Sequence, residues 1–182
     1  ASVEAVQRAD DKAQILFEDC FRVLNGPDAP ELNIVELDQK LIFHIYNKER
    51  SNNYLESYRE KDSRIVCTGE LDPCDQYYEF QGYQVFQLKD ENAGITDRGN
   101  KDLVKELFQC DVEDGVKQLV NYTWSDELGA NIPEEMVNGL DNGIEHTFEV
   151  TEDLFAEGDK SLINHRQYWY TAVAYGYNGT EA

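Results

Sequence analysis

The sequence predicts a mainly-β fold built from antiparallel strands. Three stretches carry this prediction: "KLIFHIYN" at 40–47, "FQGYQVFQL" at 80–88 and "YWYTAVAYGYN" at 168–178. They are rich in β-branched and aromatic residues, and the first and last place apolar side chains at every second position, as a half-buried strand does. Polar segments with turn-forming residues separate them. At 182 residues, the chain is long enough for one domain with a sizeable core and a small appendage.

The net charge of the chain limits the classes of partner that it can bind. It carries 37 acidic and 16 basic residues, a formal net charge of -21. Such a surface repels phosphate backbones and anionic lipid headgroups, so we expect neither nucleic acid nor a membrane surface as partner. No apolar run approaches the roughly 20 residues that span a bilayer, so no direct membrane insertion is expected.

The chain is expected to begin with a separate helical segment, residues 1–26. The stretch "DDKAQILFEDCFRVL" at 10–24 has apolar residues at helical spacing, Asp10 as an N-cap and Gly26 with Pro27 as a stop. The two prolines of "GPDAPE" then forbid helix. The main β domain is therefore predicted to span 27–182.

The first strands of this domain form a predicted hairpin. Residues 32–35 and 40–47 alternate with period two, and "LDQK" at 37–40 supplies a turn between them. On the second strand one face should carry Leu41, Phe43 and Ile45, and the other Ile42, His44 and Tyr46.

Two long insertions are predicted, at about 47–76 and 91–142. The first is polar and turn-rich, as in a surface excursion. The second begins with a loop and contains a predicted helix over 100–110, a strand over 116–124 and a segment at 125–144 that is mostly loop. A further strand is predicted in "EHTFEV" at 145–150.

The four cysteines favour disulfides over a metal site, because they are even in number and lack paired C-x-x-C spacing. Cys67 and Cys74 flank a short turn, which makes a local bridge between them sterically reasonable. Cys20 and Cys110 are then left to pair. The alternative is four reduced, partly buried thiols in a cytosolic protein.

The strand motifs resemble those of the fibronectin type III family. Tyr83 and Val85 match the G-Y-x-V core of its third strand, and Tyr168 and Ala174 match the Y-x-x-x-x-x-A pattern of its penultimate strand. Ile45 stands where the family usually has tryptophan. The resemblance implies a fibronectin type III-like antiparallel β-sandwich, here with an N-terminal helix and a helix-containing insertion.

A narrower resemblance covers most of the chain. The run from "DDKAQILFEDCFRVL" to "INHRQYWYTAVAYGYN" is similar to a segment of very large, multidomain secreted surface proteins of Bacteroidota-type bacteria, which use type IX secretion. It implies an extracellular or cell-surface location and carries no catalytic motif.

The last predicted strand presents two different faces. Tyr168, Tyr170, Ala172 and Ala174 fit a core between two sheets, with Tyr168 as a corner tyrosine that hydrogen-bonds to backbone. Trp169, Val173 and Tyr175 lie on the outward face, where they need either cover from the insertion or the N-terminal helix, or a stacked sugar. The family places a final strand beside this one, so we expect downstream sequence or a partner to complete the edge.

The sequence offers two weaker candidates for a metal site. Asp111, Glu113 and Asp114 place three oxygen ligands beside a glycine, which would suit calcium, although a charged turn explains the same pattern. His44 and His146 would meet if they lay across neighbouring strands, but two imidazoles without a third ligand more often are surface residues.

The sequence contains no nucleophile elbow, phosphate-binding glycine loop or zinc-protease motif. We therefore predict a non-catalytic extracellular structural or adhesion module of a larger surface protein, which contacts neighbouring domains or other cell-surface proteins or acts as a spacer. The alternatives are a carbohydrate-binding module that uses the outward aromatic face, or an accessory domain of a glycoside hydrolase with a carboxylate pair in the insertion.

Overall fold

The computed structural model describes residues 24–63, 65 and 75–179, with scattered positions between residues 3 and 17. Its elements in chain order are β1 (Glu31–Leu37), β2 (Lys40–Tyr46), η1 (Tyr54–Glu56), β3 (Arg59–Lys61), β4 (Tyr77–Leu88), η2 (Ile95–Asp97), β5 (Val104–Asp111), β6 (Gln118–Ser125), β7 (Ala130–Asn138), β8 (Thr147–Val150) and β9 (Trp169–Tyr177). The predicted helix at 10–24 lies largely outside the described residues.

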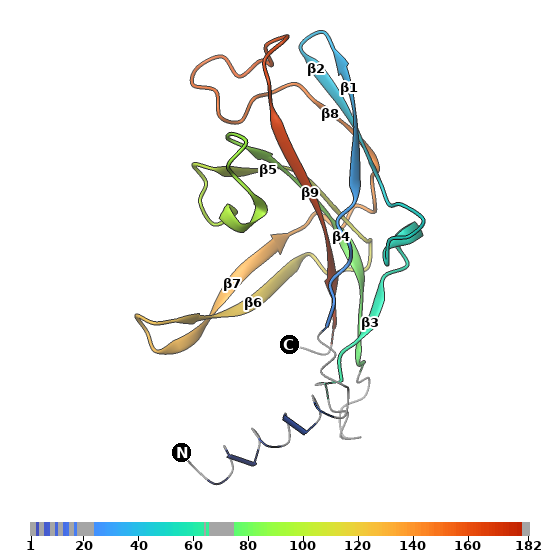
Figure 1. Ribbon diagram of the computed structural model, residues 1–182, viewed down its shortest axis with the longest axis vertical. Coiled ribbons are helices and arrows are strands. Elements are labelled where there is room, and N and C mark those ends of the chain that lie inside the picture. Colours follow the sequence, from blue (N-terminus) through green and yellow to red (C-terminus); the bar gives the residue numbers. More distant parts are fainter. Residues whose placement is uncertain are drawn as a thin grey trace.

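The strands form two antiparallel sheets and a two-stranded ribbon (Figure 1). The smaller sheet has the order β1-β2-β8. In the larger sheet β4 is central, with β9 along one side and β3 and β5 along the other. Strands β6 and β7 pair only with each other, and this ribbon extends away from both sheets (Figure 1). The mainly-β, antiparallel prediction is confirmed.

Inward-facing side chains of the two sheets share one core, an arrangement consistent with a β-sandwich. Phe43 of β2 is fully buried between Phe148 of β8, at 5.1 Å between ring centroids, and Tyr170 of β9, at 4.8 Å. Phe108 of β5 stacks on Phe148 at 3.9 Å. Aromatic contacts of this kind add to the stabilisation from buried apolar area, so this cluster joins the two layers.

The face predictions for β2 and β9 are confirmed. Phe43 and Ile45 are completely buried and Leu41 packs against the core, whereas His44 and Tyr46 face solvent. The four residues predicted to face the core from the last strand, Tyr168, Tyr170, Ala172 and Ala174, all belong to the core or pack against it. The hydroxyl of Tyr168 accepts a hydrogen bond from the backbone N–H of Ile163 at 2.9 Å, as expected of a corner tyrosine.

The helix predicted over 100–110 is wrong, because residues 104–111 form strand β5. A β-bulge explains the error: Val85 of β4 pairs with Phe108 and Phe86 pairs with Glu106, so Leu107 is an extra residue on β5. Leu107 and Phe108 both pack against the core although they are adjacent in sequence. This local loss of alternation produced an apparent helical spacing.

The segment at 125–144 is not mostly loop, since it contains β7. Pro133 and the adjacent Glu134 and Glu135 hide this strand in the sequence, and the ribbon tolerates them because all three are exposed. The segment at 47–76 is not only a surface excursion. Tyr58 belongs to the core, and its hydroxyl donates to the carbonyl of Asn25 at 2.6 Å.

Two further features bear on the predictions. Among the described strands only β4 pairs with β9, so completion of the other edge of β9 stays a prediction.

In the described part of the chain, no helix has the length and apolar character needed to cross a membrane.

Candidate binding site on the outer face of the larger sheet

The outward face of β9 is covered rather than free. Val173 and Tyr175 line a cavity of about 360 Å³ whose opposite wall comes from the base of the ribbon, at Leu119, Met136 and Val137. Trp169 is half-buried on the same strand and does not line this cavity. The insertion predicted at about 91–142 therefore covers this face. Such cover was one of the two expectations, and a stacked sugar was the other.

Tyr175 has a structural role in this face. Its hydroxyl accepts a hydrogen bond from the side-chain amide of Gln109 on β5 at 2.9 Å. The ring passes close to Gly82 of β4, because a Cβ at Gly82 would lie 2.5 Å from the Tyr175 hydroxyl. Burial raises the pKa of Tyr175. A ring held across the sheet in this way is not available as a sugar-stacking platform.

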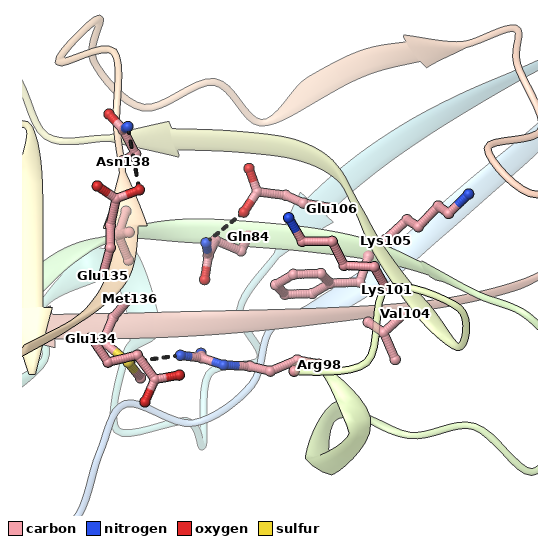
Figure 2. Close-up of a pocket in the computed structure, with 13 residues that line it drawn as sticks. Gln84, Arg98, Lys101, Val104, Lys105, Glu106, Glu134, Glu135, Met136 and Asn138 are labelled. Carbon is pink, nitrogen blue, oxygen red and sulfur yellow. Dashed lines mark hydrogen bonds between the residues drawn. The ribbon is translucent and has the colours of Figure 1, made fainter. Parts of the chain in front are cut away.

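A second cavity, of about 610 Å³, lies beside the first, between β4, β5, the loop after η2 and β7 (Figure 2). It is lined by Gln84, Phe86, Arg98, Gly99, Lys101, Val104, Lys105, Glu106, Glu134, Glu135, Met136, Val137 and Asn138. Gln84, Arg98, Met136 and Val137 also line the first cavity, so the two form one groove. Its size is typical of a small-molecule site.

Arg98 lies at the middle of this groove. Its guanidinium donates a hydrogen bond to the thioether sulfur of Met136 at 3.0 Å (Figure 2). A thioether is a weak acceptor, and Arg98 makes no ion pair within the described part of the chain. Among the described residues, four of its five side-chain N–H donors therefore have no protein acceptor, in a chain that has more than two acidic residues for each basic one.

Glu106 is an exposed carboxylate of β5 that lines the groove. One of its oxygens accepts a hydrogen bond from the side-chain amide of Gln84 at 2.8 Å (Figure 2). The pKa of Glu106 is raised, chiefly because neighbouring protein removes part of its hydration, although the Gln84 hydrogen bond and the charge of Arg98 act in the opposite direction. Lys105 is turned away, since its ammonium donates to the carbonyl of Leu154 at 2.7 Å.

The three carboxylates predicted for calcium do not gather around a common point. Among the described residues, no group of three acidic, histidine or cysteine side chains is placed to hold a metal ion. Asp111 is buried and accepts the N–H of Asp141 at 2.9 Å. Asp114 accepts the Gln81 amide at 3.1 Å, and Glu113 is exposed.

These residues instead fasten the ribbon to the sheet. The carboxylate of Asp141 accepts two backbone hydrogen bonds, from Asp114 at 2.8 Å and from Gly115 at 3.0 Å, which lower its pKa. Asp111 in turn accepts a hydrogen bond from the N–H of Asp141. The segment before β6 and the segment after β7 are therefore held together where the ribbon leaves the larger sheet. We call Asp111, Asp114, Gly115 and Asp141 the ribbon clasp.

Of the two predicted cysteine pairs, the structure describes a member of one, Cys110. Cys110 is a buried free thiol whose sulfur lies 3.5 Å from the carbonyl oxygen of Glu145, so the Cys20–Cys110 bridge is not formed in this structure. Burial also raises the pKa of the Cys110 thiol. Cys20, Cys67 and Cys74 lie outside the described residues.

The two histidines predicted as a weak metal pair lie on opposite faces of the smaller sheet. His44 pairs with Thr147 in the register and faces outward, where its ring stacks on Tyr46. The backbone of His146 pairs with Ile45, and its imidazole contacts Glu56 at 2.5 Å. A one-residue offset in register separates the two rings.

The aromatic row that is exposed lies on the ribbon and was not singled out from the sequence. Val120, Tyr122 and Trp124 occupy alternate positions of β6, with Tyr122 65% and Trp124 59% exposed. Their i, i+2 spacing in "VNYTW" places them on one face of the strand. That spacing was visible in the sequence, but nothing in it showed that the strand would project from the domain.

Comparison with known proteins gives no family for this chain. No protein-family model, no curated protein and no solved structure matches it.

Proposed function

We propose that the chain is a non-catalytic extracellular module that attaches to a neighbouring protein through the β6–β7 ribbon. The observation that carries the proposal is the exposed row of Val120, Tyr122 and Trp124 on a ribbon that extends from the domain (Figure 1). Exposed aromatic side chains grouped on one face mark interaction sites, and tryptophan and tyrosine are enriched among the residues that dominate binding energy.

The charges around the row favour a basic partner. Glu135 is directly opposite Val120 in the ribbon, and Asp126 accepts a hydrogen bond from the Trp124 indole at 2.9 Å. Lysine and arginine side chains of a partner would pair with these carboxylates and stack on the two rings. The resemblance to secreted bacterial surface proteins supports an extracellular setting, with a neighbouring domain or another surface protein as partner.

A photocrosslinking amino acid at Trp124 tests this proposal. We expect crosslinks to a surface protein when the chain is incubated with cells of the producing species. The matched control places the same amino acid at Tyr46, an exposed tyrosine on the outer face of the smaller sheet. Equal crosslinking from both positions, or none from Trp124, would contradict the proposal.

Carbohydrate binding is the second candidate function, with the aromatic rings of the ribbon in place of those predicted on β9. Tyr122 and Trp124 are neighbouring rings on one strand face, flanked by amide and carboxylate groups that accept hydrogen bonds from sugar hydroxyls. A glycan array with the wild type and the Tyr122→Ser/Trp124→Ser double variant decides between the candidates. Binding by the wild type that the double variant loses would favour the glycan over the protein partner.

A further inference from the structure

We infer that the groove beneath the ribbon binds a small zwitterion, with a carboxylate at Arg98 and an ammonium at Glu106. The site lies in the larger cavity, and the two exposed rings of the ribbon, Tyr122 and Trp124, line neither cavity. The ligand class is that of amino acids and short ω-amino acids.

Arg98 supplies the anion-binding end. A guanidinium presents paired N–H donors that match the two oxygens of a carboxylate, and the thioether of Met136 is a poor substitute for that partner. Lys101 extends over the same pocket from the loop after η2 and adds a second positive charge (Figure 2). An incoming carboxylate would exchange a weak hydrogen bond of Arg98 for charge-assisted ones.

Glu106 supplies the cation-binding end. Its hydrogen bond comes from Gln84, whose side chain is buried in the larger sheet, and this contact orients the carboxylate at the wall of the pocket. The other two carboxylates of the lining accept hydrogen bonds from side chains of the exposed ribbon, Glu134 from the Thr123 hydroxyl and Glu135 from the Asn138 amide. Glu106 is the acidic group of this pocket that a buried residue of the sheet holds in place, so we expect it to receive the ammonium.

The body of the ligand is expected to be short and apolar. Phe86, Val104 and Val137 are buried and contribute apolar surface to the lining of the pocket. The lining contains three basic and three acidic side chains: Arg98, Lys101, Lys105, Glu106, Glu134 and Glu135. Lys105 is turned toward Leu154, and the remaining lining still carries both signs of charge, which favours a ligand that also carries both over a simple anion or cation.

Three probes with a similar flexible body test the site: 5-aminopentanoate, pentanoate and pentylamine, titrated by calorimetry or NMR. We expect 5-aminopentanoate to bind at least roughly tenfold more tightly than either singly charged probe, since each end adds a charge-assisted hydrogen bond. Equal affinity for pentanoate and 5-aminopentanoate would refute the role of Glu106. Equal affinity for pentylamine and 5-aminopentanoate would refute the role of Arg98, and no binding of any probe would refute the site.

Two variants assign the ends. Arg98→Gln should weaken 5-aminopentanoate binding by roughly tenfold and leave pentylamine binding unchanged. Glu106→Gln should also weaken 5-aminopentanoate binding by roughly tenfold, but it should leave pentanoate binding unchanged. The retained probe also shows that each variant is folded. Arg59→Gln is the matched control, because Arg59 pairs with Glu79 on β4 and does not line the pocket. If it weakens binding equally, the effect is one of net charge and the assignment is wrong.

Discussion

Substitution of Gly82 by alanine tests the packing of the outer face of the larger sheet. A Cβ at this position would lie 2.3 Å from the carbonyl oxygen of Cys110 and 2.5 Å from the hydroxyl of Tyr175. The first contact is with backbone, which cannot turn away, and the second is with a ring that lies over the glycine. Both contacts must be relieved by movement of β4, β5 or β9.

The magnitude follows from two contributions. Insertion of a methyl group into a packed site costs about 1–3 kcal/mol. Displacement of Tyr175 also breaks its hydrogen bond with Gln109, which adds about 0.5–1.5 kcal/mol. We therefore expect Gly82→Ala to lower the free energy of unfolding by about 2–4 kcal/mol, which corresponds to a fall in Tm of roughly 5–15 °C for a chain of this length.

Thermal unfolding followed by circular dichroism measures this change. Gly26→Ala is the control, because no heavy atom lies within 4 Å of a Cβ built at Gly26. We expect its Tm to stay within about 2 °C of the wild type, as for most surface substitutions. A Gly82→Ala variant as stable as this control would show that the Tyr175 ring does not lie over β4, and the description of the covered face would be wrong.

Three further predictions concern separate parts of the fold. Folding lowers the pKa of Asp141, so the contribution of this carboxylate to stability is present above its unfolded pKa of about 4 and is lost as the pH falls through the folded pKa. Asp141→Asn should therefore reduce the loss of stability in acid, as measured by urea unfolding from pH 7 to pH 2. Tyr168→Phe should cost about 0.5–1.5 kcal/mol in the same unfolding assay, because the N–H of Ile163 loses its acceptor, and an unchanged midpoint would contradict the corner role. Cys110 should resist iodoacetamide in the native protein and react in urea without reductant; if it stays unreactive in urea, it is disulfide-bonded.

The parts of the fold that could be predicted are those in which neighbouring residues face different environments. In β2, buried Phe43 and Ile45 alternate with exposed His44 and Tyr46, and in β9 the residues that pack on the core recur at every second position, so both strands and their core faces were predicted. In β5 the bulge at Leu107 breaks this alternation. In β7 no alternation exists, because most of its residues are exposed. Apolar and polar residues alternate in the sequence only where the two faces of a strand have different surroundings.

The candidate site was harder to predict for a different reason. Arg98, Glu106 and Met136 come from a loop and two strands, and no short motif joins them. The aromatic faces show the same limit. Tyr175 was predicted to face outward and no face was predicted for Trp124, but only the tertiary arrangement determines that the first is covered and the second is exposed. Exposure is a property of the assembled domain and not of a single strand.

The central position of β4 has a consequence for how the chain folds. β4 is bonded along most of its length to β9, from Glu79 opposite Tyr177 to Leu88 opposite Trp169, and these partners are far apart in the sequence. Closing so long a loop costs entropy before any contact repays it, and topologies dominated by distant pairings fold slowly. During synthesis, β4 and the core beneath it must wait for residues 169–177 to leave the ribosome. Until then the apolar face of β4 remains open to aggregation or to chaperones.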